Sequence, residues 1–162
     1  MSPLTTEQRA ALVATIGSFP AELNTAIAAL PPNRWDTPYR EGGWTARQVV
    51  HHVADSHMNA FIRFRWALTE ESPTIKPYDE TRWAKLPDST SEDPAASVQI
   101  LGGLHRRWHR MLEAMTPGDF ARTATHPDHG PITVDWLLQL YAWHGRHHIG
   151  HLKLVTARPG DM

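Results

Sequence analysis

Four stretches of the chain repeat apolar residues at the three- and four-residue spacing of an amphipathic helix. Each stretch opens with a residue that can cap a helix N-terminus: Thr5, Thr45, Asp93 and Thr133, in that order. The second stretch ends near Thr69, and Pro20 is expected to kink or restart the first. With no convincing long strand elsewhere, the pattern predicts an all-α four-helix bundle that spans residues 1–162 as one domain.

The connection between the second and third helices, from about Glu70 to Asp93, is long for a compact domain. A connection of this length is usually functional or crosses between distant elements. Four of its residues are candidates to cap a pocket, although a surface strap is an equally good interpretation: Tyr78, Asp79, Glu80 and Trp83. Further on, residues 126–131 read as a turn between two threonine-bearing segments, which predicts a small hairpin.

The fourth predicted helix carries four histidines within eight positions. A turn of about 100° per residue places His144, His148 and His151 on its apolar face and turns His147 away. The opposite, solvent-facing side holds Asp135, Gln139, Arg146 and Lys153. Imidazoles on an apolar face need polar partners, and two at i and i+4 can reach one ion. Core histidines bonded to ordinary polar neighbours are the alternative, but the cluster favours a metal site.

Three more histidines, His51, His52 and His57, lie on the second helix. Periodicity puts His57 nearest the apolar centre, His52 at the edge of the apolar face and His51 further out. Spacing alone does not choose between His52 and His57 as a third ligand. On the third helix, His105 and His109 repeat the i, i+4 spacing but lie off the apolar centre, which predicts solvated or boundary side chains.

The composition excludes several classes of function. Sixteen basic and seventeen acidic residues give a net charge of −1, so no nucleic acid and no anionic membrane is expected as a partner. The chain contains no cysteine, which excludes disulfides, thiolate ligands and a cysteine nucleophile. No apolar run approaches the ~20 residues of a membrane span and the N-terminus does not resemble a signal peptide, so a cytoplasmic location is expected.

Several of these segments together resemble one known family. The stretch from Gly42 to Asn59 resembles the helix-two signature of the YfiT-type metal-dependent hydrolases of the DinB-like superfamily, which include the bacillithiol transferases. Four further segments recur in the same order: residues 77–80, 104–108, 126–128 and the histidine cluster of the fourth helix. The resemblance implies a DinB-like four-helix bundle, often a homodimer, that holds one divalent ion on His52, His144 and His148.

Three imidazole ligands would leave the ion a free coordination position, as in catalytic zinc sites. The site can therefore activate either water, for hydrolysis, or a low-molecular-weight thiol similar to bacillithiol, for S-transfer to a small electrophilic substrate. Zinc is the expected metal, with nickel, manganese or iron as alternatives. An aromatic cleft around Trp44, Trp83 or Trp143 is expected beside it, but no paired carboxylates indicate a general base.

Arg63 lies one helical row along from His52 and is a candidate anchor for a substrate carboxylate, with an ordinary exposed arginine as the alternative. The alternative for the whole protein is a non-catalytic metal-binding or stress-response module with a closed coordination shell and no adjoining pocket.

Overall fold

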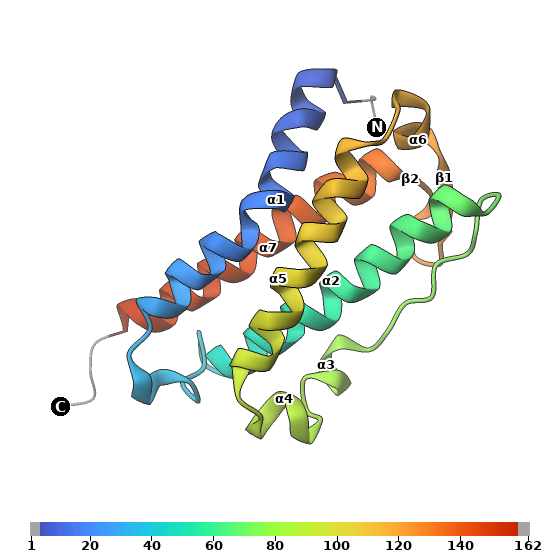
Figure 1. Cartoon of the computed structure of the whole chain (residues 1–162). Coiled ribbons are helices and arrows are strands. Elements are labelled where there is room, and N and C mark those ends of the chain that lie inside the picture. Colours follow the sequence, from blue (N-terminus) through green and yellow to red (C-terminus); the bar gives the residue numbers. More distant parts are fainter. Residues whose placement is uncertain (1–3, 159–162) are drawn as a thin grey trace.

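The computed structural model describes residues 4–158 and confirms the four-helix bundle (Figure 1). Its long helices are α1 (Thr6–Ala28), α2 (Ala46–Thr69), α5 (Pro94–Glu113) and α7 (Val134–Ala157). The shorter elements between them are η1 (Pro32–Arg34), α3 (Glu80–Trp83), α4 (Pro87–Ser91), α6 (Pro117–Ala121), β1 (Thr123–His126) and β2 (Gly130–Thr133). The two strands pair antiparallel and form the predicted hairpin. Both ends of the predicted domain, residues 1–3 and 159–162, lie outside the described residues.

All four predicted caps begin their helices. Thr5 and Thr45 form capping boxes with Gln8 and Gln48, while Asp93 and Thr133 accept a hydrogen bond from the backbone of the first turn. Helix α1 does not restart at Pro20, because it is continuous from Thr6 to Ala28.

The connection after α2 is not structureless, since it contains the short helices α3 and α4. It is also attached to the hairpin: the Ile75 amide donates to the Thr125 carbonyl at 2.8 Å, and the Thr125 amide donates to the Pro73 carbonyl at 2.9 Å. The connection is therefore a fixed crossover along one side of the bundle (Figure 1).

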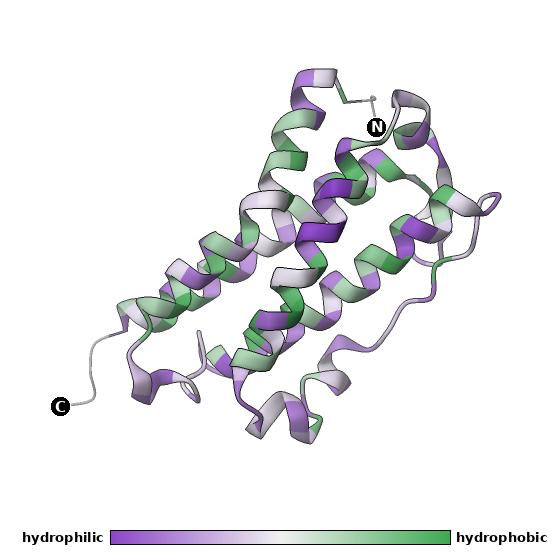
Figure 2. Ribbon diagram, in the orientation of Figure 1, coloured by the Kyte–Doolittle hydropathy of each residue, from purple (hydrophilic) through white to green (hydrophobic). Residues whose placement is uncertain are grey.

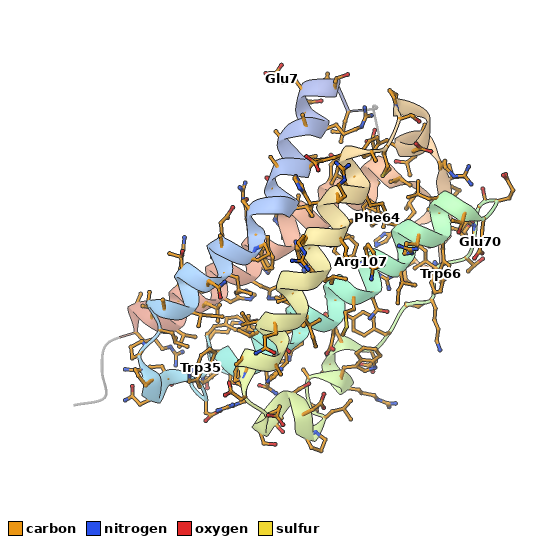
Figure 3. All side chains as sticks on the ribbon, viewed as in Figure 1. Glu7, Trp35, Phe64, Trp66, Glu70 and Arg107 are labelled. Atoms are coloured by element: carbon orange, nitrogen blue, oxygen red, sulfur yellow. The ribbon has the colours of Figure 1, made fainter. Side chains whose placement is uncertain are left out.

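Helices α1 and α2 occupy opposite corners of the bundle, and each of them packs against both α5 and α7 (Figure 1). The central space is filled by side chains from all four long helices (Figure 3). Hydrophobic and hydrophilic residues alternate along each of these helices, as expected for elements with one face in the core and one in solvent (Figure 2). As a consequence, side chains from α2, α5 and α7 can meet at one level.

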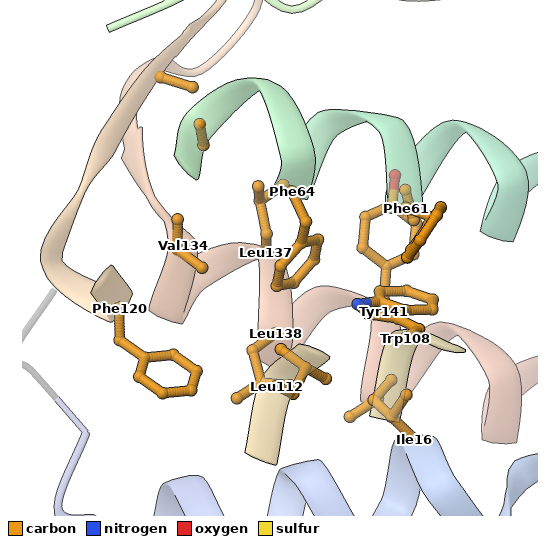
Figure 4. Packing of buried hydrophobic residues seen from close by; sticks show 14 of the residues in the cluster. Ile16, Phe61, Phe64, Trp108, Leu112, Phe120, Val134, Leu137, Leu138 and Tyr141 are labelled. Atoms are coloured by element: carbon orange, nitrogen blue, oxygen red, sulfur yellow. The ribbon is translucent and has the colours of Figure 1, made fainter. Parts of the chain in front are cut away.

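The buried apolar residues form two clusters at opposite ends of the bundle. One contains Ile16, Phe64, Trp108 and Leu138 and lies toward the hairpin (Figure 4). The other contains Phe19, Val50, Leu101 and Leu152 and lies toward η1. Between them along the chain come the histidines of α2, α5 and α7: His57, His105, His144 and His148. A polar layer of imidazoles thus interrupts the core about halfway along the helices.

The prediction that Asp135 faces solvent is wrong, because this residue is only 6% exposed. Arg9 of α1 covers it, with 2.7 Å between Arg9 Nη2 and Asp135 Oδ2. The spacing of residues along one helix does not show that the start of α1 lies beside the start of α7. In the part of the chain that the structure describes, no helix combines the length and apolar character needed to cross a membrane.

Candidate metal centre

Three histidines from two helices meet where α2 packs against α7. His52 lies in the second turn of α2, and His144 and His148 lie one turn apart on α7. One imidazole nitrogen of each lies within 4.8 Å of the other two, and the Nε2 atoms of His52 and His144 are 3.3 Å apart. Two nitrogens that share a tetrahedral ion at the usual zinc–imidazole distance are separated by about 3.4 Å. The His52–His144 pair therefore has the spacing of two ligands of one ion, and a nitrogen of His148 lies close enough to complete a group of three.

The protonation states of the three rings also suit a cation. Burial, followed by the effect of neighbouring histidines, lowers the pKa of His52 to about 4 and that of His144 to about 3. The pKa of His148 is lowered further for the same reasons, burial first and His144 second. At neutral pH all three imidazoles are uncharged, so each has a nitrogen lone pair to offer, which metal binding requires.

A cavity of about 520 Å³ opens beside these histidines. Its walls come from the loop before α2, from α2 itself, from α3 and from α7. They consist of Tyr39, Arg40, Gly42, Gly43, Trp44, His52, Glu80, Thr81, Trp143, His144, His147, His148 and His151. This volume lies in the range of small-molecule sites. The predicted aromatic lining is present as Trp44 and Trp143, whereas Trp83 packs on Tyr78 with ring centroids 4.5 Å apart.

Of the four residues that the sequence suggested as a pocket cap, Glu80 lines this cavity. Apart from the histidines, Glu80 and Arg40 are the acidic and the basic residue among the lining residues that the structure describes. They come from different segments, so one wall offers an acceptor and another a donor for the polar ends of a small molecule.

The loop before α2 holds the rim of the cavity in place. Its turn is closed by hydrogen bonds from the Tyr39 amide to the Trp44 carbonyl at 3.1 Å and from the Gly43 amide to the Arg40 carbonyl at 3.0 Å. Gly42 has a φ of +64°, a conformation that favours glycine. The turn places Trp44 4.5 Å from the ring of His52 and stacks Tyr39 on His151 at 3.8 Å.

The structure separates the two candidates for the third ligand. His57 is fully buried and faces away from the cavity, where its Nε2 lies 3.2 Å from His144 Nδ1 and its Nδ1 lies 2.8 Å from His105 Nε2. His57 therefore contacts His144 from behind, whereas His52 lies on the cavity side. The prediction that His57 lies near the apolar centre of α2 is confirmed, because its side chain is buried. In that position its ring contacts His105 and His144.

Two predictions about histidine exposure are wrong. His51, predicted to point outward, is buried, with Nδ1 2.8 Å from Ser97 Oγ and Nε2 3.2 Å from the Glu92 carbonyl. His105, predicted at the boundary, is 1% exposed and lies against α1 and His57. In both cases another segment covers the side chain: Glu92 and Ser97 cover His51, and α1 covers His105. The spacing of residues along one helix does not show such contacts. His109 is only partly buried, in agreement with the prediction.

The position of Arg63 does not support an anchoring role. It is 8% exposed, with Nη1 donating to the Tyr141 hydroxyl at 2.6 Å and Nη2 to the Lys76 carbonyl at 3.1 Å. Arg63 is also absent from the described residues that line the cavity. His126 and His129 lie at the hairpin, with ring centroids 4.7 Å apart, and they are likewise absent from the cavity lining.

Two residues near the site were missed as candidates. His147 is exposed yet lines the cavity, stacked on Trp143 at 4.6 Å. Ser56 is buried, and its hydroxyl lies 3.4 Å from His144 Nε2. Its position four residues after His52, on the same side of α2, was a signal that could have found it.

Comparison with known proteins places these observations in a family. A family model described as the DinB superfamily matches residues 16–152. A Bacillus subtilis protein named "Putative metal-dependent hydrolase YfiT" is 46% identical over 155 residues, which cover 95% of this chain and 87% of that protein. A Bacillus mycoides protein, also named a putative metal-dependent hydrolase, is 50% identical over 143 residues, covering 88% of this chain and 82% of that protein.

Solved structures show the same fold. The structure of YfiT from Bacillus subtilis, described as "a probable metal-dependent hydrolase with an unusual four-helix bundle topology", aligns with a TM-score of 0.92 at 45% identity over 96% of this chain and 89% of that chain. A mycothiol-dependent maleylpyruvate isomerase aligns with a TM-score of 0.72 at 16% identity over 94% of this chain and 63% of that chain. At that identity the isomerase shows the likeness of fold alone.

Proposed function

The chain belongs to the DinB superfamily, and we propose that it is a divalent-metal-dependent enzyme in which His52, His144 and His148 hold the ion. The observation that carries this proposal is the convergence of three neutral imidazoles beside a cavity of about 520 Å³. A structural ion needs a closed shell of four protein ligands, whereas a catalytic ion needs an open position next to space for a reactant. Relatives named as metal-dependent hydrolases support the same interpretation.

When bound, a divalent ion supplies Lewis acidity, which lowers the pKa of water to about 7 or ionises a thiol and so provides a nucleophile at neutral pH. The chain's own residues would position the reactants. Trp44 and Trp143 offer apolar surface to a small electrophile, while Arg40 and Glu80 can bind its polar ends. Ser56 Oγ, 3.4 Å from His144 Nε2, would help to hold that ring in place.

We propose that the nucleophile is either water or a low-molecular-weight thiol. The names of the relatives favour water and hydrolysis. For transfer, the thiol must come from a co-substrate, because the chain has no cysteine. Zinc is the metal we expect first, since it suits a site of three imidazoles, with nickel, manganese and iron as alternatives. A homodimer and a cytoplasmic location stay predictions from the family resemblance and the composition.

The experiment that tests the function combines metal analysis with two assays on the same preparations. Wild type and His148→Ala are loaded with zinc, desalted and analysed for bound metal. Each is then assayed for hydrolysis of a panel of small esters and amides without thiol. In parallel, each is assayed for conjugation of monochlorobimane to cysteine, glutathione or a cysteinyl glycoside. His129→Ala serves as the control, because it changes a histidine of the hairpin that is absent from the cavity lining.

We expect about one zinc ion per chain in wild type and in His129→Ala, and none in His148→Ala, with any activity lost together with the metal. Turnover without thiol identifies a hydrolase, and turnover only with thiol identifies a transferase. Stoichiometric metal without either reaction would favour the non-catalytic metal-binding module. Unchanged metal content in His148→Ala would contradict the proposal that His52, His144 and His148 hold the ion.

A further inference from the structure

The carbonyl of Ile16, buried in the middle of α1, lacks the hydrogen bond that a helix normally provides. In an α-helix this carbonyl accepts from the amide four residues later, which here would be residue 20. That residue is Pro20, which has no N–H and whose ring pushes against the carbonyl of the residue four positions before it. A buried carbonyl needs another donor. The donor is His105 of α5, whose Nδ1 lies 2.7 Å from the Ile16 oxygen.

This contact determines where the His105 proton lies. A carbonyl oxygen only accepts hydrogen bonds, so the hydrogen between the two atoms belongs to His105 Nδ1. A neutral imidazole with its hydrogen on Nδ1 presents Nε2 as an acceptor. His57 Nδ1 lies 2.8 Å from that Nε2 and must therefore donate to it.

The same reasoning passes from His57 to His144. With its hydrogen on Nδ1, neutral His57 presents Nε2 as an acceptor, and His144 Nδ1 lies 3.2 Å away. His144 Nδ1 therefore carries a hydrogen, and His144 Nε2 keeps its lone pair. That Nε2 is the atom 3.3 Å from His52 Nε2, on the cavity side. The three rings His105, His57 and His144 each carry one hydrogen on Nδ1, and these hydrogens point to the Ile16 carbonyl, to His105 and to His57, respectively.

We propose that Pro20, His105 and His57 form a positioning chain that holds the His144 proton on Nδ1 and so directs the Nε2 lone pair at the metal. Histidines that bind a metal commonly donate a hydrogen bond from the N–H of their second ring nitrogen to a carbonyl or carboxylate. In this protein the acceptor is another neutral imidazole, and the direction of the whole chain is set by a carbonyl that a proline frees in a different helix.

The packing around the chain leaves little freedom for an alternative arrangement. His57 and His105 are 0% and 1% exposed, and Phe19 lies within 5.0 Å of both ring centroids. A Cβ at Gly145 would lie 2.7 Å from the Phe19 ring and 3.3 Å from His57 Cε1. The backbone of α7 therefore packs closely against Phe19 and His57. If the hydrogens pointed the opposite way, His144 would carry its proton on Nε2, and this nitrogen could not bind an ion.

The inference rests on the proposed metal site, but its first test needs no metal. Long-range ¹H–¹⁵N spectra of the metal-free protein, with histidines assigned by single substitution, report which ring nitrogen carries the hydrogen. We expect His105, His57 and His144 all to carry it on Nδ1. A hydrogen on Nε2 of His57 or His105 in the folded wild-type protein would overturn the proposal.

The second test compares two substitutions of His57 by zinc affinity, measured by competition with a chromophoric chelator. His57→Phe keeps a ring but removes both hydrogen bonds, and we expect zinc affinity to fall about 10- to 100-fold. His57→Gln keeps one donor and one acceptor, and we expect it to recover most of that loss. Phe64→Leu is the matched control, because Phe64 is buried on α2 and packs on Trp108 rather than on the chain. It should lower the unfolding temperature and leave zinc affinity within about two-fold.

These outcomes separate a positioning role from a structural one. If His57→Phe and His57→Gln destabilise the fold but bind zinc as wild type does, the positioning chain is refuted while the metal site stands. If wild type itself binds no divalent ion, the proposed function fails, whereas the spectra still decide the direction of the hydrogen bonds.

Pro20→Ala, which restores an amide to the Ile16 carbonyl, should shift the His105 signals in the direction of a weaker Nδ1 hydrogen bond. Unchanged His105 signals would exclude Pro20 from the chain.

Discussion

The same i, i+4 spacing separates His144 from His148 on α7 and His105 from His109 on α5, and these two pairs are used differently. His144 and His148 on α7 both approach His52 and line the cavity. On α5, His105 is buried as a link behind His144, and His109 is part-exposed at the surface, 3.7 Å from Glu113. Spacing along one helix therefore selects candidate ligands, and the elements that face the helix decide which of them can share an ion.

The reason for the difference lies in the neighbours of each helix. Helix α7 packs against the turn of α2 that carries His52, so a third imidazole is present at the right level. Helix α5 packs against both α1 and α2, and His105 uses one ring nitrogen for the Ile16 carbonyl and the other for His57. Both of its nitrogens are therefore occupied in the core, away from the residues that line the cavity. The same spacing thus gives a ligand pair in one place and a supporting contact in the other.

The sharpest way to break this comparison is to replace one histidine from each pair. We expect His144→Phe to weaken zinc binding more than about 100-fold, because it removes a ligand rather than a supporting contact. His109→Phe should leave zinc affinity within about two-fold, because its ring lies at the surface beside Glu113. Chelator competition on both variants measures the difference. Equal losses in the two variants would mean that the α5 pair also takes part in binding.

The close approach of α7 to the buried histidines can be tested at two glycines of that helix. Gly145→Ala would put a Cβ 2.7 Å from the buried Phe19 ring, and we expect a destabilisation of about 1–3 kcal/mol from overpacking. Gly150→Ala is the matched control: among the described residues, no heavy atom lies within 4 Å of the added Cβ apart from adjacent residues and the backbone of its own helix. It should stabilise the helix by up to about 1 kcal/mol. Urea unfolding gives both values, and a neutral Gly145→Ala would contradict the packing argument.

The burial of His105 also predicts how stability depends on pH. Burial lowers its pKa to about 4 from an ordinary value of 6.5, so the unfolded chain binds the proton more readily between these values. The stability that neutral His105 provides is complete above about pH 6.5 and is lost as the pH falls toward 4. His105→Phe should be less stable than wild type near pH 8, and the difference should shrink by about 2 kcal/mol near pH 5. Urea unfolding of the metal-free proteins at both pH values measures this, and a constant difference would count against a neutral buried His105.

The smallest effect is expected at Gly17, where an added Cβ would lie 2.7 Å from the His109 ring. The His109 side chain is 33% exposed, so it can rotate away, unlike Phe19 beside Gly145. Gly17→Ala should therefore change the free energy of unfolding by less than about 1 kcal/mol, measured in the same urea series. A cost as large as that of Gly145→Ala would show that His109 is held as firmly as the buried histidines.

The helices and their beginnings could be predicted from local sequence, because a cap and an apolar period act within a few residues. Thr45 with Gln48, and Asp93 before Pro94, begin their helices in the structure as predicted. The α7 histidines also followed from periodicity, since one face of a helix is a local property. Resemblance to a family was needed to prefer His52 over His57, because both lie on the inner side of α2.

Tertiary structure alone decided what each buried histidine contacts. His51 is covered by Ser97 and the Glu92 carbonyl, and Asp135 is covered by Arg9, although both were expected to face outward. The link from the Ile16 carbonyl through His105 and His57 to His144 joins residues on four helices. A hydrogen bond between distant segments depends on how the helices pack. The pattern of residues within one helix therefore does not predict which carbonyl will lie against which imidazole.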